Sequence, residues 1–227
     1  MTYQYRADYM SKAALLPTLM SSSPTESFYA RRAKRLFDVL VVALVSVPVL
    51  VILLVLALFV AMDGHSPFYI QNRIGRHGRI FKMIKLRTMV NNADAVLQKN
   101  LARDPVARAE WDEFQKLRHD PRITRIGRIL RKASLDELPQ LINVVLGDMS
   151  IVGPRPMMED QRSIYPGTEY YRMRPGITGF WQISSRNDSS FSDRAHFDRD
   201  YFHGVSFVTD LRVMWRTVSV VIKGTGC

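Results

Sequence analysis

The longest apolar run of the chain lies near its start. Residues 39–62 (VLVVALVSVPVLVILLVLALFVAM) contain no charged residue, and a helix of this length can cross a hydrocarbon core about 30 Å thick. Pro48 lies inside the run, where it removes a helix hydrogen bond and favours a bend, and Ser46 is close enough to satisfy a freed backbone group. The pattern predicts a membrane helix within residues 30–62, with a break at Ser46 and Pro48.

Basic residues flank this run on both sides. They are Arg31, Arg32, Lys34 and Arg35 before it, and Arg73, Arg76, Arg79, Lys82, Lys85 and Arg87 after it. Because Lys and Arg collect on the cytoplasmic side of membrane helices, both ends are drawn to the same side. This favours a re-entrant helix that enters and leaves on the cytoplasmic face. A plain transmembrane helix is the alternative.

The polar and apolar positions that follow predict a hairpin and then helices. Residues 67–89 alternate around Gly75 and Gly78, which is typical of two short strands joined by a turn. Lys85 and Arg87 would share one face of the second strand. Residues 91–118 read as helix, interrupted near the Asp104-Pro105 pair.

A further helix is predicted near the end of the chain. One stripe is apolar and carries a tryptophan, and the opposite face is basic; the apolar members are Leu211, Met214, Trp215, Val218, Val221 and Ile222. Such a helix can lie on an anionic membrane surface or pack on the protein's own core, and the sequence leaves both open.

The expected fold is mixed α/β and mainly helical, with a re-entrant membrane helix that has a Pro break, a small β-hairpin and interfacial amphipathic helices. Three segments are expected. Residues 1–29 form a flexible leader, residues 30–62 the membrane helix, and residues 63–227 a catalytic domain on the cytoplasmic face.

Composition adds an anionic partner to this description. The chain has 32 Lys and Arg against 21 Asp and Glu, a net charge of +11. The partner can be nucleic acid, a phospholipid surface or a phosphorylated substrate, and charge alone does not choose. The one cysteine, Cys227, excludes an internal disulfide and a cysteine-based zinc site.

Two adjacent carboxylates, Asp136 and Glu137, begin a second apolar pattern. The stretch SLDE, residues 134–137, fits a capping box in which Ser134 and Glu137 cap a helix. That interpretation leaves Asp136 unexplained. A helix start favours both a bound phosphate and an ionised carboxylate, and a carboxylate that attacks phosphorus needs such screening.

Several basic residues can add to this screening. Lys85 and Arg87 come from the strand, Arg131 precedes the carboxylates, Arg155 is held between two prolines, and Arg174 begins RPGITG. The planar guanidinium group of arginine meets two phosphate oxygens at once. The set predicts a phosphate-binding site.

Four motifs follow the apolar run in a fixed order: KLRTM, LDELPQ, DMSIVGPRP and RPGITG. With the apolar run they resemble the bacterial sugar transferases, the monotopic polyprenol-phosphate phosphoglycosyl transferases that start exopolysaccharide and related glycan assembly. The resemblance covers residues 29–223. It is strongest to the short members, the exopolysaccharide-initiating galactosyl-phosphate transferases.

The resemblance implies a two-step transfer of hexose-1-phosphate, galactose or glucose, from a UDP-sugar to undecaprenyl phosphate, with release of UMP. Asp136 would form a covalent sugar-phosphate intermediate, and Glu137 would place Mg²⁺ or handle a proton. The expected cofactor is Mg²⁺, held by Asp136 and Glu137. Asp198 and Tyr201 match a later D-x-x-Y pattern that is expected to support the substrate site.

The implied partners are a UDP-hexose, undecaprenyl phosphate and an anionic phospholipid membrane, and the implied location is the cytoplasmic face of the bacterial inner membrane. A homodimer is left open. We expect no nucleic acid, because the sequence has no recognisable nucleic-acid-binding motif. The alternative is a membrane-bound scaffold that binds phosphate or nucleic acid without turnover, in which Asp136 and Glu137 only cap a helix.

Overall fold

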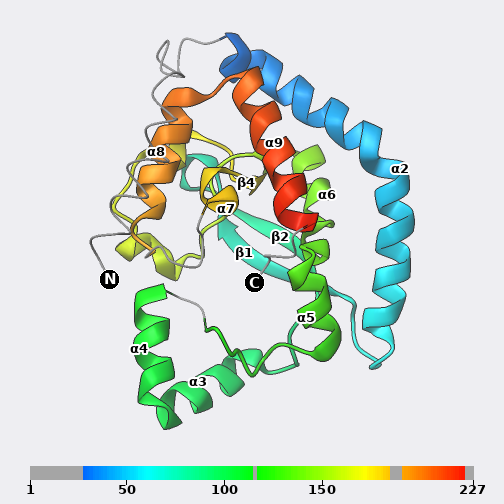
Figure 1. Cartoon of the computed structure of the whole chain (residues 1–227), viewed down its shortest axis with the longest axis vertical. Helices are drawn as coiled ribbons and strands as arrows, with labels where there is room; N and C mark the ends of the chain where they lie inside the picture. Colours follow the sequence, from blue (N-terminus) through cyan, green and yellow to red (C-terminus); the bar gives the residue numbers. More distant parts are fainter. Residues whose placement is uncertain (1–27, 115–116, 185–190, 223–227) are drawn as a thin grey trace.

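The computed structural model describes residues 28–114, 117–184 and 191–222. A π-helical turn, η2 (Tyr29–Ala33), leads into one long helix, α2 (Lys34–Ala61). Figure 1 shows α2 curving around one side of the other elements. Most of the predicted leader, residues 1–27, lies outside the described residues.

The rest of the chain is mainly helical, as predicted. The hairpin strands are β1 (Phe68–Ile74) and β2 (Ile80–Leu86), joined by the turn η3 (Arg76–Gly78). The following elements are α3 (Ala93–Arg103), α4 (Pro105–Phe114), α5 (Arg125–Lys132), η4 (Leu135–Glu137), α6 (Gln140–Leu146), β3 (Ser150–Val152), η5 (Asp160–Ile164), η6 (Glu169–Arg172), β4 (Gly176–Thr178), α7 (Phe180–Ile183), α8 (Arg194–Gly204) and α9 (Phe207–Ile222).

The predicted hairpin and the helix interruption are both confirmed. β1 and β2 pair antiparallel, from Phe68 opposite Leu86 to Ile74 opposite Ile80. Gly78, in the turn, has a φ of 75°, which glycine adopts without strain. The break between α3 and α4 falls at Asp104, and Pro105 is the first residue of α4, where its missing N–H does no harm.

Two short parallel strands, β3 and β4, bring distant segments together. Ser150 pairs with Gly176 and Val152 with Thr178. A Cβ atom on Gly176 would lie 2.1 Å from the backbone nitrogen of Gly153, so the approach of the two strands requires glycine. This pairing places the chain just before Arg155 beside the chain just after Arg174.

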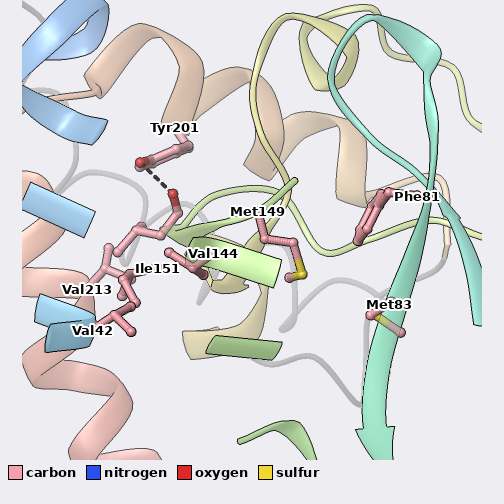
Figure 2. Close-up of a cluster of buried hydrophobic side chains, with 9 residues drawn as sticks. Val42, Phe81, Met83, Val144, Met149, Ile151, Tyr201 and Val213 are labelled. Carbon is pink, nitrogen blue, oxygen red and sulfur yellow. Dashed lines mark hydrogen bonds between the residues drawn. The ribbon is translucent and has the colours of Figure 1, made fainter. Parts of the chain in front are cut away.

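The main core joins elements from the start, the middle and the end of the described chain. Val42 of α2, Met83 of β2, Val144 of α6, Tyr201 of α8 and Val213 of α9 are all buried in one cluster. Figure 2 shows Val42 and Val213 close together, with Met83 on its strand across from them and Met149 between. Because Val42 belongs to this cluster, α2 is part of the core and not an appendage to it.

The helix α6 is fixed to the edge of β2 by one asparagine. Asn143 is 1% exposed. Its Oδ1 atom accepts from the backbone N–H of Ile84 at 3.1 Å, and its Nδ2 atom donates to the carbonyl of Lys82 at 2.8 Å. The side chain therefore continues the strand's hydrogen bonding and sets the position of Lys85 relative to the turn before α6.

The N-terminal end of α2 is held by buried polar groups. Asp38 accepts from the backbone N–H of Ile151 at 3.1 Å and from the hydroxyl of Ser150 at 2.8 Å. One turn earlier, the Lys34 ammonium lies 2.6 Å from the carboxylate of Asp210, which is fully buried on α9. Buried charges are stable in such places only when they are paired and hydrogen-bonded, as these are.

The C-terminal end of α2 is held by the same domain. The guanidinium of Arg87 donates to both oxygens of Asp63, at 2.8 and 2.6 Å, and to the carbonyl of Val60 at 3.1 Å. Val60 is buried against Leu86 and Leu130. Both ends of the apolar helix are therefore attached to one body.

The middle of α2 is exposed and apolar, with Leu44 82% and Val47 72% exposed. By length and composition the helix is able to cross a membrane. It continues as helix through Pro48, and the Ser46 hydroxyl donates to the carbonyl of Ala43 at 2.8 Å. The structure thus has no interruption of the helix at the predicted break, and the re-entrant path stays a prediction.

The helix α9 uses two faces. Asp210 and Val213 face the core, where both are buried. Leu211, Trp215 and Val218 are exposed, Trp215 by 76%. The helix thus packs on the core through positions outside the predicted stripe, and much of the stripe is exposed. Contact of this stripe with a membrane surface stays a prediction.

Candidate active site

The two carboxylates lie on a short turn between two helices. Asp136 and Glu137 belong to the 3₁₀ turn η4, which follows α5 and leads into α6. The predicted capping box is wrong in detail. Ser134 has a left-handed backbone, with φ at 54°, and its side chain makes no capping bond to the turn. The carboxylates are thus presented by an irregular turn, and the capping interpretation does not explain them.

Glu137 is held by two cations from different parts of the chain. Its Oε1 atom lies 3.0 Å from Nζ of Lys85, on β2, and 3.5 Å from Nη1 of Arg155. These three residues line one pocket together with Arg73 and Gln140. The pocket also contacts residues of β2 and β4, so the strands set its walls.

Asp136 is the more buried carboxylate, with 6% exposed. Burial raises the pKa of Asp136 above its ordinary value, and the charge of Glu137 adds to the rise. The positive charges of Lys85, Arg131 and Arg155 oppose it, Lys85 most strongly. A poorly hydrated carboxylate surrounded by cations can approach an anionic phosphate, because the cations screen the repulsion between the two.

Arg131 reaches the same site from the end of α5. Its Nε atom donates to the hydroxyl of Thr88 at 2.9 Å, which fixes the direction of the guanidinium group. Burial lowers the pKa of Arg131, and the charge of Asp136 acts against this change. The structure therefore brings together five of the predicted residues: Asp136, Glu137, Lys85, Arg131 and Arg155.

Two predicted phosphate ligands lie elsewhere. Arg87 is used by the contacts to Asp63 and Val60 that hold the end of α2, because β2 ends at Leu86 and the strand's alternation does not continue. Arg174 donates from Nε to the carbonyl of Gly147 at 2.9 Å, at the end of α6. Their positions correct the prediction that both line the same site as Asp136.

Asp198 is buried behind the site and does not line the pocket. Its Oδ2 atom accepts from the Tyr165 hydroxyl at 2.6 Å. Burial raises the pKa of Asp198 to about 7, against the opposing effects of the Tyr165 hydrogen bond and the charge of Arg194. The role expected for Asp198 from the D-x-x-Y pattern stays a prediction.

Arg73 is a site residue that was not predicted from the sequence. Arg73 lies opposite Phe81 in the hairpin, so it shares a face with Met83 and Lys85 and lines the pocket with them. The two-residue period of the strands would have placed Arg73 on that face, had it been applied to β1 as well as to β2.

The predicted magnesium ion would be held by the carboxylate pair. Mg²⁺ in proteins is commonly bound by one or two carboxylates, with substrate phosphates and water completing the octahedron. Asp136 and Glu137 are adjacent in the sequence and lie on the same turn, η4. Among the described residues, no group of three or more His, Cys, Asp or Glu side chains could hold a metal without a substrate.

Comparison with known proteins gives the family. The sequence profile described as Bacterial sugar transferase matches residues 29–224. The chain is 51% identical over 200 residues to the UDP-galactose-lipid carrier transferase of Erwinia amylovora, and 47% identical over 198 residues to the exopolysaccharide production protein ExoY of Sinorhizobium fredii. It is 43% identical over 199 residues to the undecaprenyl-phosphate galactose phosphotransferase of Salmonella typhimurium.

These matches cover 87%, 86% and 87% of this chain, in the same order. The chain spans 42% of the length of the Erwinia and Salmonella proteins and 87% of the length of the Sinorhizobium protein. The residues that the family profile matches include the turn with Asp136 and Glu137, the cations around it and the whole of α2. Two of these three relatives are named for galactose, and the chain belongs to the bacterial sugar transferase family.

Proposed function

We propose that this chain transfers hexose-1-phosphate from a UDP-sugar to undecaprenyl phosphate and so initiates exopolysaccharide or related glycan assembly. The observation that carries the proposal is the buried Asp136 among Lys85, Arg131 and Arg155, in a chain of this family. The names of the relatives favour galactose as the hexose, and glucose is the alternative.

In the first step, an oxygen of Asp136 forms a bond to the β-phosphorus of the donor. The bond from that phosphorus to the bridging oxygen breaks, and its electron pair leaves on UMP. Lys85, Arg131 and Arg155 lower the cost of bringing the carboxylate and the diphosphate together. In the second step, a phosphate oxygen of the lipid attacks the same phosphorus and frees Asp136.

Glu137 acts in this proposal as a positioning residue. The Oε1 atom of Glu137 lies 3.0 Å from Nζ of Lys85 and 3.5 Å from Nη1 of Arg155. These contacts hold the two cations beside Asp136. When Mg²⁺ is bound by Asp136 and Glu137, it neutralises charge on the diphosphate as UMP departs.

We propose that α2 enters the inner membrane from the cytoplasmic face and returns to it. The two attachments of α2, through Asp38 and Lys34 at one end and Arg87 at the other, support this path. A helix with both ends on one domain cannot place those ends on opposite sides of a bilayer. Its exposed middle, which includes Val47, would then lie among lipid tails.

The same membrane surface would meet α5, α6 and α9. Each of these helices has exposed apolar side chains, which are Ile126 and Ile129 on α5, Ile142, Val145 and Leu146 on α6, and Leu211, Trp215 and Val218 on α9. Arg125 and Arg128 on α5 and Arg212 and Arg216 on α9 add positive charge that suits anionic phospholipid.

The test is UMP release from UDP-galactose and UDP-glucose by the purified protein, with Mg²⁺ and undecaprenyl phosphate. We expect release by the wild type and loss of at least about 10³-fold in Asp136→Asn. Asp112→Asn, on the exposed face of α4, is the matched control and should behave as wild type. Label from a sugar-labelled donor should remain on the protein when the lipid is left out, and it should be absent in Asp136→Asn.

Two outcomes contradict the proposal. Full activity of Asp136→Asn would mean that the nucleophile lies elsewhere. No UMP from any UDP-sugar, with folded wild-type protein, would reject the transferase assignment for this chain.

A further inference from the structure

Two arginines that the proposed mechanism does not use lie beside the carboxylate pocket. Arg73 comes from the end of β1 and lines the pocket with Lys85 and Glu137. Arg194, at the start of α8, lies with its guanidinium carbon 4.3 Å from the centroid of the Trp181 ring. The guanidinium carbon of Arg155 lies 5.6 Å from the same centroid. Three guanidinium groups from distant parts of the chain thus converge on one side of the site.

The hydrogen-bonding capacity of Arg73 and Arg194 is only partly used. Within the part of the chain that the structure describes, the Nε atoms of both residues are buried without a hydrogen-bond partner. The two Nη atoms of Arg73 donate to neutral acceptors, the carbonyl of Pro156 at 3.2 Å and the side chain of Gln71 at 2.5 Å. A buried charged donor without an acceptor is costly, so these groups suit an anionic ligand.

The three arginines also repel one another. Burial lowers the pKa of Arg73 to about 10 and that of Arg194 to about 9, and the charge of Arg155 adds to both changes. The charge of Asp198 opposes the lowering of the Arg194 pKa, but Asp198 also accepts a hydrogen bond from the Tyr165 hydroxyl. An anion placed between the guanidinium groups would offset both the repulsion and the lost hydration.

We propose that Arg73 and Arg194, together with Arg155, bind the nucleotide-side phosphate of the donor, the group that leaves on UMP. This inference deepens the proposed function and rests on it. As Asp136 bonds to the β-phosphorus, the electron pair of the breaking bond collects on the bridging oxygen, which stays with UMP. Guanidinium groups stabilise that growing charge by charge-assisted hydrogen bonds.

The hairpin geometry favours the nucleotide over the lipid phosphate as the ligand. The Phe68 and Leu86 end of the hairpin lies against the C-terminal end of α2, where Leu86 packs on Val60. Arg73 is five residues further along β1, about 16 Å at about 3.3 Å per residue. A lipid phosphate approaching from α2 would reach Lys85, which lies opposite Tyr69, before it reached Arg73, so the position of Arg73 suits a ligand that arrives from water.

The test compares Arg73→Gln and Arg194→Gln with wild type in the complete transfer assay. We expect the inhibition constant of UMP and the KM for UDP-galactose to rise about 10- to 100-fold, with the KM for undecaprenyl phosphate changed less than about twofold. Arg73→Lys and Arg194→Lys keep the charge and should recover part of the affinity. Arg172→Gln, whose exposed guanidinium stacks on Phe202, is the matched control and should match wild type.

The outcomes separate this inference from the function on which it rests. Unchanged UMP inhibition in all four variants, with an active wild type, would overturn the inference alone. A raised KM for undecaprenyl phosphate with unchanged UMP inhibition would assign the arginines to the lipid phosphate and would also overturn it. If a glutamine variant is strongly destabilised in thermal unfolding, the lysine variant at that position replaces it. An unchanged inhibition constant of UMP in the lysine variant would then overturn the inference.

Discussion

The asparagine that joins α6 to β2 is the most direct test of how the fold positions the site. Asn143→Leu keeps the size of the side chain and removes both of its polar atoms. The backbone N–H of Ile84 and the carbonyl of Lys82 then lose their partners. Lys85, one residue beyond Ile84, is no longer fixed beside Glu137, so activity should fall together with stability.

The magnitude follows from the two lost hydrogen bonds. Each unsatisfied backbone group costs about 1–3 kcal/mol, and the added apolar side chain returns about 1–2 kcal/mol, so the net loss is about 3 kcal/mol. For a chain of this size such a loss lowers the unfolding midpoint by about 6–12 °C.

The assay is thermal unfolding in one detergent, followed by UMP release at a temperature where both proteins are folded. Asn72→Leu is the matched control, because Asn72 is exposed and lies on the same hairpin, opposite Lys82. An Asn143→Leu protein that unfolds within about 2 °C of Asn72→Leu would refute the reasoning. So would a destabilised protein whose rate of UMP release is unchanged, since Lys85 would then not depend on Asn143.

Three further predictions concern single side chains. Lys85→Met removes the strongest influence that lowers the pKa of Asp136; the acid limb of the pH profile for UMP release should therefore move to higher pH, and an unmoved limb would contradict this. Asp198 has a folded pKa of about 7 and an ordinary value of 3.8. Because the folded state binds the extra proton, the contribution of Asp198 to the free energy of unfolding is fully present below about pH 4. This contribution is lost as the pH rises to about 7, by up to about 4 kcal/mol. Asp198→Asn should remove this loss, which denaturant unfolding at pH 5 and pH 8 would measure. Gly176→Ala should cost about 2 kcal/mol or more by overpacking, whereas Gly204→Ala, with open space around the new methyl group, should cost less than about 1 kcal/mol of unfolding free energy.

The hairpin and the helix that follows the carboxylates were predictable because their signals are local. Alternation over seven residues defines a strand, and the apolar spacing after Asp136 and Glu137 defines the helix that follows them. The partners of Arg87 were not predictable in the same way. Arg87 follows Lys85 by two residues, which predicted that both side chains share one face of the strand. The strand instead ends at Leu86, and the guanidinium group of Arg87 binds Asp63 just after α2.

The positions of Ser134 and Asp198 needed tertiary information for different reasons. Ser134 fits the capping pattern, yet it adopts a left-handed backbone in the tight connection between α5 and η4, which moves its side chain away from the turn. Asp198 lies on α8, a helix with no clear apolar face in its sequence, and its burial depends on Tyr165 from a remote segment. Patterns along one element carry no information about such contacts.

The two attachments of α2 determine how this protein can be taken apart. Removing the helix would uncover Leu86 and Leu130, which pack on Val60, and would leave Asp210 buried without Lys34. Three successive residues at the end of β2 have different roles. Lys85 binds Glu137 in the site, Leu86 packs on Val60 in the core, and Arg87 binds Asp63 at the end of α2. The connection from α2 to β1, residues 62–67, is itself bound by Arg87 through Asp63 and the carbonyl of Ser66. A water-soluble version is therefore better made by redesigning the outer surface of α2, with its inner contacts kept, than by truncation.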